Sequence, residues 1–72
     1  MYKEQLGSKL RFARDRAGYS QEQIAEIMNI SQSQISKLEK GIQEPNIELL
    51  GKLIDFYEIS ADWLLGTNIA NK

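Results

Sequence analysis

The chain has 72 residues and a formal net charge of −1, so it can form one small domain with a single core and little more. It contains no cysteine and no histidine, which excludes disulfides, thiolate chemistry and the usual zinc sites. No apolar run reaches the length that spans a bilayer, and no signal-peptide pattern opens the chain. We therefore expect a cytoplasmic protein with no metal, no cofactor and no membrane partner.

The first predicted helix runs from about Glu4 to Ala17. Its apolar residues fall on one stripe with helical spacing, namely Leu6, Leu10, Ala13 and Ala17. Gly18 follows as a C-terminal cap. Phe12 lies off the stripe, and we expect it to pack against the C-terminal helix. The basic residues lie mostly off the stripe as well, and Arg11 among them is a candidate for a phosphate contact.

Two short helices joined by a tight turn follow, at residues 21–28 and 32–40. Each begins with a capping box, in which a serine precedes a glutamine by three residues: Ser20 with Gln23, and Ser31 with Gln34. The apolar residues recur at helical spacings, at Ile24, Ala25, Met28, Ile35 and Leu38. Asn29 lies between the helices and tolerates a left-handed backbone. This pattern predicts a helix-turn-helix unit.

The surface of the second of these helices is unusually polar. Between Ser31 and Lys40, only Ile35 and Leu38 are apolar, and the exposed residues are Gln32, Ser33, Gln34, Ser36, Lys37 and Lys40. Such side chains hydrogen-bond to base edges and phosphates. Serine lowers helix propensity, so helix stability does not explain this composition.

The remaining chain predicts two more helices. Asn46 caps a helix at residues 47–57, and Ser60 caps a short helix at residues 61–65 that Gly66 ends. Trp63, Leu64 and Leu65 are consecutive, so they cannot all face one core. Two interpretations stay open: Trp63 and Leu65 form a dimer contact, or Trp63 covers the edge of the core. Ile42 is apolar in an otherwise polar loop, and either burial or exposure is compatible with the sequence.

The run SQEQIAEIMNISQSQISKLEKG, followed by a proline and by ADWLLG, resembles the phage repressor/Cro-type (XRE) helix-turn-helix domains. The residues that carry the resemblance are Gln21, Ala25, Ile35, Leu38, Glu39 and Gly41. Asn29 departs from the family, which usually has glycine at this position. The resemblance implies an all-α, compact, five-helix lambda-repressor-like domain. We assign this domain to residues 1–66 and expect residues 67–72 to form a flexible tail.

The resemblance also implies double-stranded DNA as the partner, bound by a homodimer whose helix 32–40 enters the major groove. The expected base contacts are Gln32, Ser33, Ser36 and Lys37. The expected phosphate contacts are Gln21, Lys40 and Gln43, to which we add Arg11. A salt bridge between Arg14 and Glu39 is expected to fix the angle of the reading helix without touching bases. No small-molecule ligand is expected within this chain.

The distribution of charge bears on this hypothesis. Residues 1–42 carry seven basic and five acidic residues, a balance of +2, whereas residues 43–72 carry two basic and five acidic residues, a balance of −3. A binding field depends on the local face and not on the total charge. The basic footprint is nevertheless weak for a nucleic-acid-binding protein.

Three functions can be compared on these observations. The leading hypothesis is a sequence-specific DNA-binding transcriptional regulator, a Cro/C1-type repressor that reads an inverted-repeat operator as a dimer. The alternative is a protein-interaction module on the same fold, antitoxin-like or contacting a sigma factor, which the acidic C-terminal half favours. A catalytic role is poorly supported, because the paired carboxylates Glu22/Glu26 and Asp55/Glu58 have the spacing of solvated helix faces.

Overall fold

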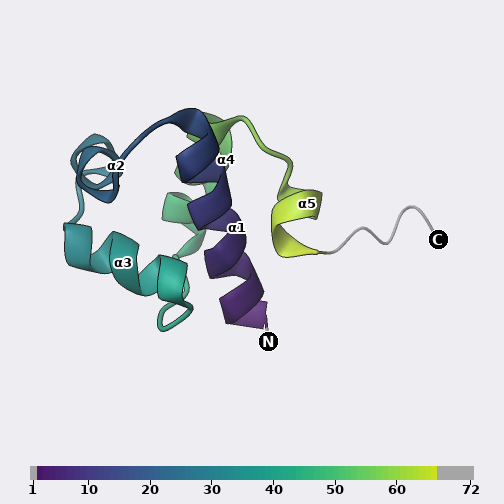
Figure 1. Cartoon of the computed structure of the whole chain (residues 1–72). Coiled ribbons are helices and arrows are strands. Elements are labelled where there is room, and N and C mark those ends of the chain that lie inside the picture. Colours follow the sequence, from purple (N-terminus) through teal and green to yellow (C-terminus); the bar gives the residue numbers. More distant parts are fainter. Residues whose placement is uncertain (1, 67–72) are drawn as a thin grey trace.

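The computed structural model describes residues 2–66, with side chains from residue 5 onward. The described residues form helices and no strand. In chain order the helices are α1 (Tyr2–Ala17), α2 (Gln21–Met28), α3 (Gln32–Lys40), α4 (Ile47–Tyr57) and α5 (Ala61–Leu65), as Figure 1 shows. The predicted all-α, five-helix fold is confirmed, and only the start of α1 differs, at Tyr2 instead of Glu4. The expected tail at residues 67–72 lies outside the described residues.

Short polar side chains define where the later helices begin. In both predicted capping boxes the serine Oγ accepts a hydrogen bond from the N–H three residues later, over 3.1 Å. The glutamine side chains complete the boxes by accepting from the serine N–H, at 2.8 Å for Gln23 and 3.4 Å for Gln34. The residues that cap α2 to α5 are Ser20, Ser31, Asn46 and Ser60. Each satisfies a backbone donor that helix geometry leaves free.

Left-handed residues end the helices and redirect the chain. Asn29 has φ of 61° at the end of α2, as its place in the sequence predicted. Glu58 has φ of 55° at the end of α4, which the sequence did not predict. A residue with a Cβ pays about 1 kcal/mol or more for this conformation. Glu58 therefore adopts a conformation in this turn that its local preference disfavours.

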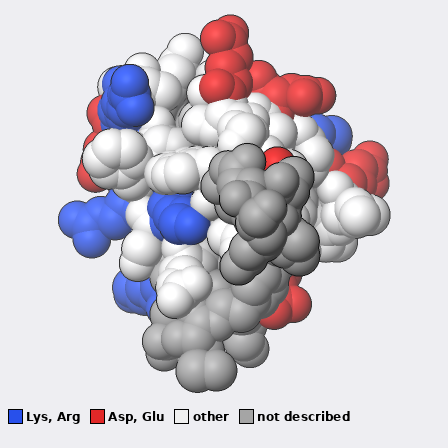
Figure 2. Space-filling model, turned by 90° about the vertical axis from the view of Figure 1, so that its right-hand side faces the viewer, with Lys and Arg blue, Asp and Glu red and all other residues white. Residues whose placement is uncertain are grey.

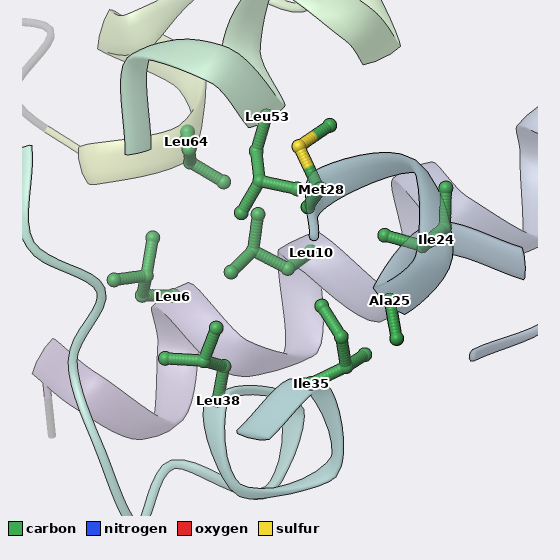
Figure 3. Close-up of a cluster of buried hydrophobic side chains, with 9 residues drawn as sticks. All are labelled: Leu6, Leu10, Ile24, Ala25, Met28, Ile35, Leu38, Leu53 and Leu64. Atoms are coloured by element: carbon green, nitrogen blue, oxygen red, sulfur yellow. The ribbon is translucent and has the colours of Figure 1, made fainter. Parts of the chain in front are cut away.

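Side chains from all the described helices meet in one core, which Figure 3 shows around Leu10. Its buried members are Leu6, Leu10, Ile24, Ala25, Met28, Ile35, Leu38, Leu53 and Leu64. The predicted stripe of α1 is buried at Leu6, Leu10 and Ala13, but Ala17 is exposed. Ala17 is the last residue of α1, where the chain turns away from the core. The apolar face of α4 is fully buried only at Leu53, and its other members are partly buried.

The helices lie on two sides of α1. In Figure 1, α2 and α3 lie to one side of α1, and α5 lies to the other. On α5, Leu64 is buried with 1% exposure, Leu65 is partly buried and Trp63 is 40% exposed. The ring centroids of Trp63 and Phe12 lie 6.1 Å apart. Phe12 therefore packs against the C-terminal helix, as expected. Within residues 2–66, no helix combines the length and apolarity that crossing a membrane requires.

Candidate nucleic-acid interface

The outer face of α3 carries the residues expected to contact bases. Ile35 and Leu38 are buried, at 2% and 4% exposure, and anchor the inner face. On the outer face, Gln32, Ser33 and Lys37 are exposed, and Ser36 is partly buried. Their spacing places these four residues on one face of the helix, over two successive turns. Figure 1 shows that α3 lies at the edge of the molecule, on the side away from α5. The face is therefore open to a large partner.

The turn between α2 and α3 is held by backbone hydrogen bonds. The N–H groups of Asn29 and Ile30 donate to the carbonyls of Glu26 and Ala25, at 3.1 and 2.9 Å. Ser31 follows in an extended conformation and caps α3. Ala25 is 4% exposed, and its small side chain lets the two helices approach closely. Together these features define a helix-turn-helix unit whose second helix presents a polar face.

A buried ion pair ties α3 to α1. Arg14 Nε donates to Glu39 Oε2 at 2.8 Å, and Arg14 Nη2 donates to Glu39 Oε1 at 3.0 Å. The two side chains are only 10% and 5% exposed. The remaining Arg14 nitrogen, Nη1, donates to the Tyr19 carbonyl at 2.9 Å. The expected pair is thus present with bidentate geometry, which holds both partners in one orientation.

Protonation in this cluster follows from the same contacts. The hydrogen bond to Glu39 raises the pKa of Arg14, and burial opposes that rise. Burial is the larger cause that raises the pKa of Tyr57, and the negative charge of Glu39 adds to it. Both groups therefore hold their protons more firmly than in water.

Two contacts to the last turn of α3 were missed by the sequence analysis. Gln21, expected at a phosphate, donates its side-chain Nε2 to Glu39 Oε1 at 3.0 Å. Gly7 is buried where α1 meets α3, and a Cβ there would lie 2.5 Å from the carbonyl oxygen of Leu38 and 2.6 Å from that of Glu39. A glycine inside a predicted helix was the available signal for the second contact. The sequence carries no comparable signal for the first.

The other expected phosphate contacts are dispersed. Lys40 and Gln43 are exposed where α3 ends and the following loop begins, and Glu44 is exposed close by. Arg11 lies on α1, and its Nε is 3.9 Å from the carboxylate of Asp15, with both side chains largely exposed. Asp15 therefore offsets part of the Arg11 charge. Arg11 and Glu39 line one shallow hollow, so Arg11 borders the contact between α1 and α3.

The charges separate over the surface. On the face in Figure 2, most of the basic side chains lie in the left half, and most of the acidic ones lie along the top and the right. In the described part of the chain, no three acidic side chains come close enough together to hold a metal ion.

Comparison with known proteins agrees with this geometry. Residues 10–64 match the sequence profile of the helix-turn-helix family. The chain is 39% identical over 67 residues to the HTH-type transcriptional regulator ImmR of Bacillus subtilis strain 168, which covers 93% of this chain and 53% of ImmR. It is 36% identical over 60 residues to the SPbeta prophage-derived uncharacterized HTH-type transcriptional regulator YonR of the same strain, covering 83% of this chain and 56% of YonR.

A third relative comes from Acinetobacter baylyi strain ADP1. The chain is 35% identical over 69 residues to its competence pilus inhibition repressor, covering 93% of this chain and 63% of that protein. The chain belongs to the phage repressor/Cro-type (XRE) family of helix-turn-helix DNA-binding domains. It spans about half the length of the first two relatives.

Proposed function

We propose that this protein is a sequence-specific, double-stranded DNA-binding transcriptional regulator of the cytoplasm, and that it represses transcription from an inverted-repeat operator. The observation that carries the proposal is the outer face of α3. This face is polar and open, and it belongs to a helix that a buried ion pair fixes to α1. A rigid helix with such a face fits the major groove. Three relatives named as transcriptional regulators or repressors support the regulatory role.

Base reading is assigned to four residues of α3. Gln32 can pair with N6 and N7 of adenine, and Lys37 can pair with O6 and N7 of guanine. Ser33 and Ser36 lie beside them and can donate to or accept from either base. Gln34 is exposed but contributes to the cap of α3, so we leave it out of the reading set.

Phosphate contacts would position the domain on the duplex. Gln21 is the first residue of α2, where backbone N–H groups lack helical partners and favour an anion. Arg11, Lys40 and Gln43 complete the proposed set. Because few of these groups are cationic, we expect moderate affinity that falls as the salt concentration rises.

The proposed dimer would use the exposed side of α5. Trp63 and the adjacent Phe12 are 40% and 55% exposed. Leu65, the other residue expected at the contact, is partly buried against the core. One domain makes few base contacts, so a second copy is needed for tight binding. A symmetric dimer of this kind reads half-sites about 34–36 Å apart, roughly one helical turn.

Replacing Lys37 with alanine tests the assignment of base reading. We expect Lys37→Ala to lower discrimination between the preferred site and single-base variants of it by about 1–3 kcal/mol. The matched control is Lys40→Ala, which removes a phosphate contact and should weaken binding to all sites alike. Fluorescence anisotropy on a panel of duplexes measures both effects. Equal losses over the panel for the two variants would refute the assignment.

The alternative function, a protein-interaction module, draws support from the acidic C-terminal half of the chain. It predicts that the folded domain neither binds heparin nor shifts duplex DNA at low salt. Binding to heparin or a shift of duplex DNA that is lost as the salt concentration rises favours the DNA-binding function.

A further inference from the structure

The carboxylate of Glu39 receives hydrogen bonds from two other helices. Arg14 of α1 donates from Nε and Nη2, at 2.8 and 3.0 Å. Gln21 of α2 donates from its side-chain amide to Oε1, also at 3.0 Å. Glu39 lies in the last turn of α3, whereas Gln21 opens α2. The hydrogen bond therefore joins the beginning of the helix-turn-helix unit to its end.

This bond closes the unit at the side opposite its turn. The backbone bonds around Asn29 hold the end of α2 to the beginning of α3. Without a second link, α3 could pivot about that turn, because only Ile35 and Leu38 anchor it in the core. The ion pair resists movement relative to α1, and the Gln21 amide resists movement relative to α2. The partly buried side chain of Gln21 agrees with an inward role.

We propose that Gln21 is a positioning residue for DNA reading, whose side-chain amide acts through Glu39 to set the orientation of α3. This rests on the proposed function, in which α3 reads bases. The phosphate contact at the beginning of α2 then belongs to the backbone N–H of Gln21, and the side chain is occupied by the carboxylate. The two roles predict different effects of removing the amide, because a phosphate contact is blind to sequence and a positioning contact is not.

Gln21→Met separates these effects, since methionine has similar length and cannot donate a hydrogen bond. The measured quantity is the ratio of affinities for the selected duplex and for duplexes altered at the base pairs facing Gln32 and Lys37. We expect this ratio to fall by about fivefold or more, part of what a well-placed base contact provides. The matched control is Gln43→Met, the same change at an exposed loop residue. The control should weaken binding to all duplexes alike and leave the ratio unchanged.

A measurement without DNA tests the hydrogen bond itself. In nitrogen-15 spectra of the free protein, the side-chain amide of Gln21 should exchange with solvent more slowly than that of Gln43. Rapid exchange at Gln21, or an unchanged ratio in Gln21→Met, overturns the positioning role. If the unmodified protein shows no sequence preference, the proposed function is wrong, and so is the role of Gln21 in DNA reading. Slow exchange of the Gln21 amide would still report its hydrogen bond to Glu39.

Discussion

The contacts of α1 with α3 and with α5 are built in opposite ways. Against α3, a buried glycine lets the two backbones touch, and an ion pair with side chains 10% and 5% exposed fixes the orientation. Against α5, Leu64 is buried, but the Phe12–Trp63 pair is largely exposed, and Lys9 Nζ donates to the Trp63 carbonyl at the surface. Because α3 buries only two apolar residues in the core, it needs polar contacts to fix its orientation. The α5 contact instead leaves apolar surface open.

Breaking the ion pair should have the largest effect on stability. We expect Glu39→Ala to lower the free energy of unfolding by about 3–5 kcal/mol, because the buried Arg14 loses its bidentate partner. It keeps only the more exposed carboxylate of Asp15, which lies 3.3 Å from its Nη1. Urea unfolding followed by circular dichroism measures this change. The control is Lys52→Ala, which removes an exposed pair with Glu48 at 3.9 Å and should change stability by less than about 1 kcal/mol. Similar losses in the two variants would contradict the difference between buried and exposed pairs.

The close approach of α1 and α3 at Gly7 can be tested by comparison with Gly51, which also lies inside a helix. Gly7→Ala should destabilise the domain by about 1–3 kcal/mol, because the new Cβ meets two backbone carbonyls that must move. At Gly51, inside α4, an added Cβ meets no neighbour within 4 Å. Gly51→Ala should therefore stabilise by about 0.5–1 kcal/mol through helix propensity. Thermal unfolding of both variants gives the comparison, and a shared sign would refute it.

Weakening the α5 contact should have a smaller and more local effect. Lys9→Met removes the hydrogen bond to the Trp63 carbonyl and the cation over the indole ring, 5.6 Å from its centroid. For such an exposed contact we expect a loss of about 0.5–1 kcal/mol. Hydrogen exchange should accelerate in α5 while α3 stays protected. Acceleration spread evenly over both helices would show that the two contacts are not independent.

The tyrosine beside the ion pair predicts a dependence on alkaline pH. Because the pKa of Tyr57 is raised in the folded state, the folded protein holds this proton more tightly than the unfolded chain. The stabilisation is complete below about pH 10, the ordinary pKa of tyrosine, and is lost as the pH rises above it. Tyr57→Phe should therefore flatten the fall in stability above pH 10. Denaturant midpoints collected across that range test this, and identical slopes for the two proteins would contradict it.

Local features of the fold could be predicted from the sequence because neighbouring residues determine them. Ser31 and Gln34 specify the beginning of α3 within four residues, and Asn29 specifies the turn before it. The burial of Leu64 between Trp63 and Leu65 could not be chosen from sequence, because it depends on how α5 rotates against α1. The exposure of Ile42, at 60%, depends in the same way on how the loop lies.

Among the contacts between distant residues, only the one that the family resemblance implied could be predicted from the sequence. The Arg14–Glu39 pair followed from the family pattern, and the structure supplies its bidentate geometry. The Gln21–Glu39 bond joins residues 18 positions apart and has no periodic signature. The same is true of the backbone contact at Gly7, which needs the actual distance between two helices. The polar outer face of α3 could be predicted from composition. Of the contacts that hold α3 in place, only the ion pair could be predicted.

We propose that α3, held in one orientation by its contacts with α1 and α2, reads DNA sequence. The most direct test is selection of bound duplexes from a random library at low salt, followed by sequencing. We expect enrichment of an inverted repeat with half-sites about one helical turn apart. A single enriched half-site would keep the reading role and remove the dimer. No enrichment by the folded protein would contradict the claim and favour the protein-interaction function.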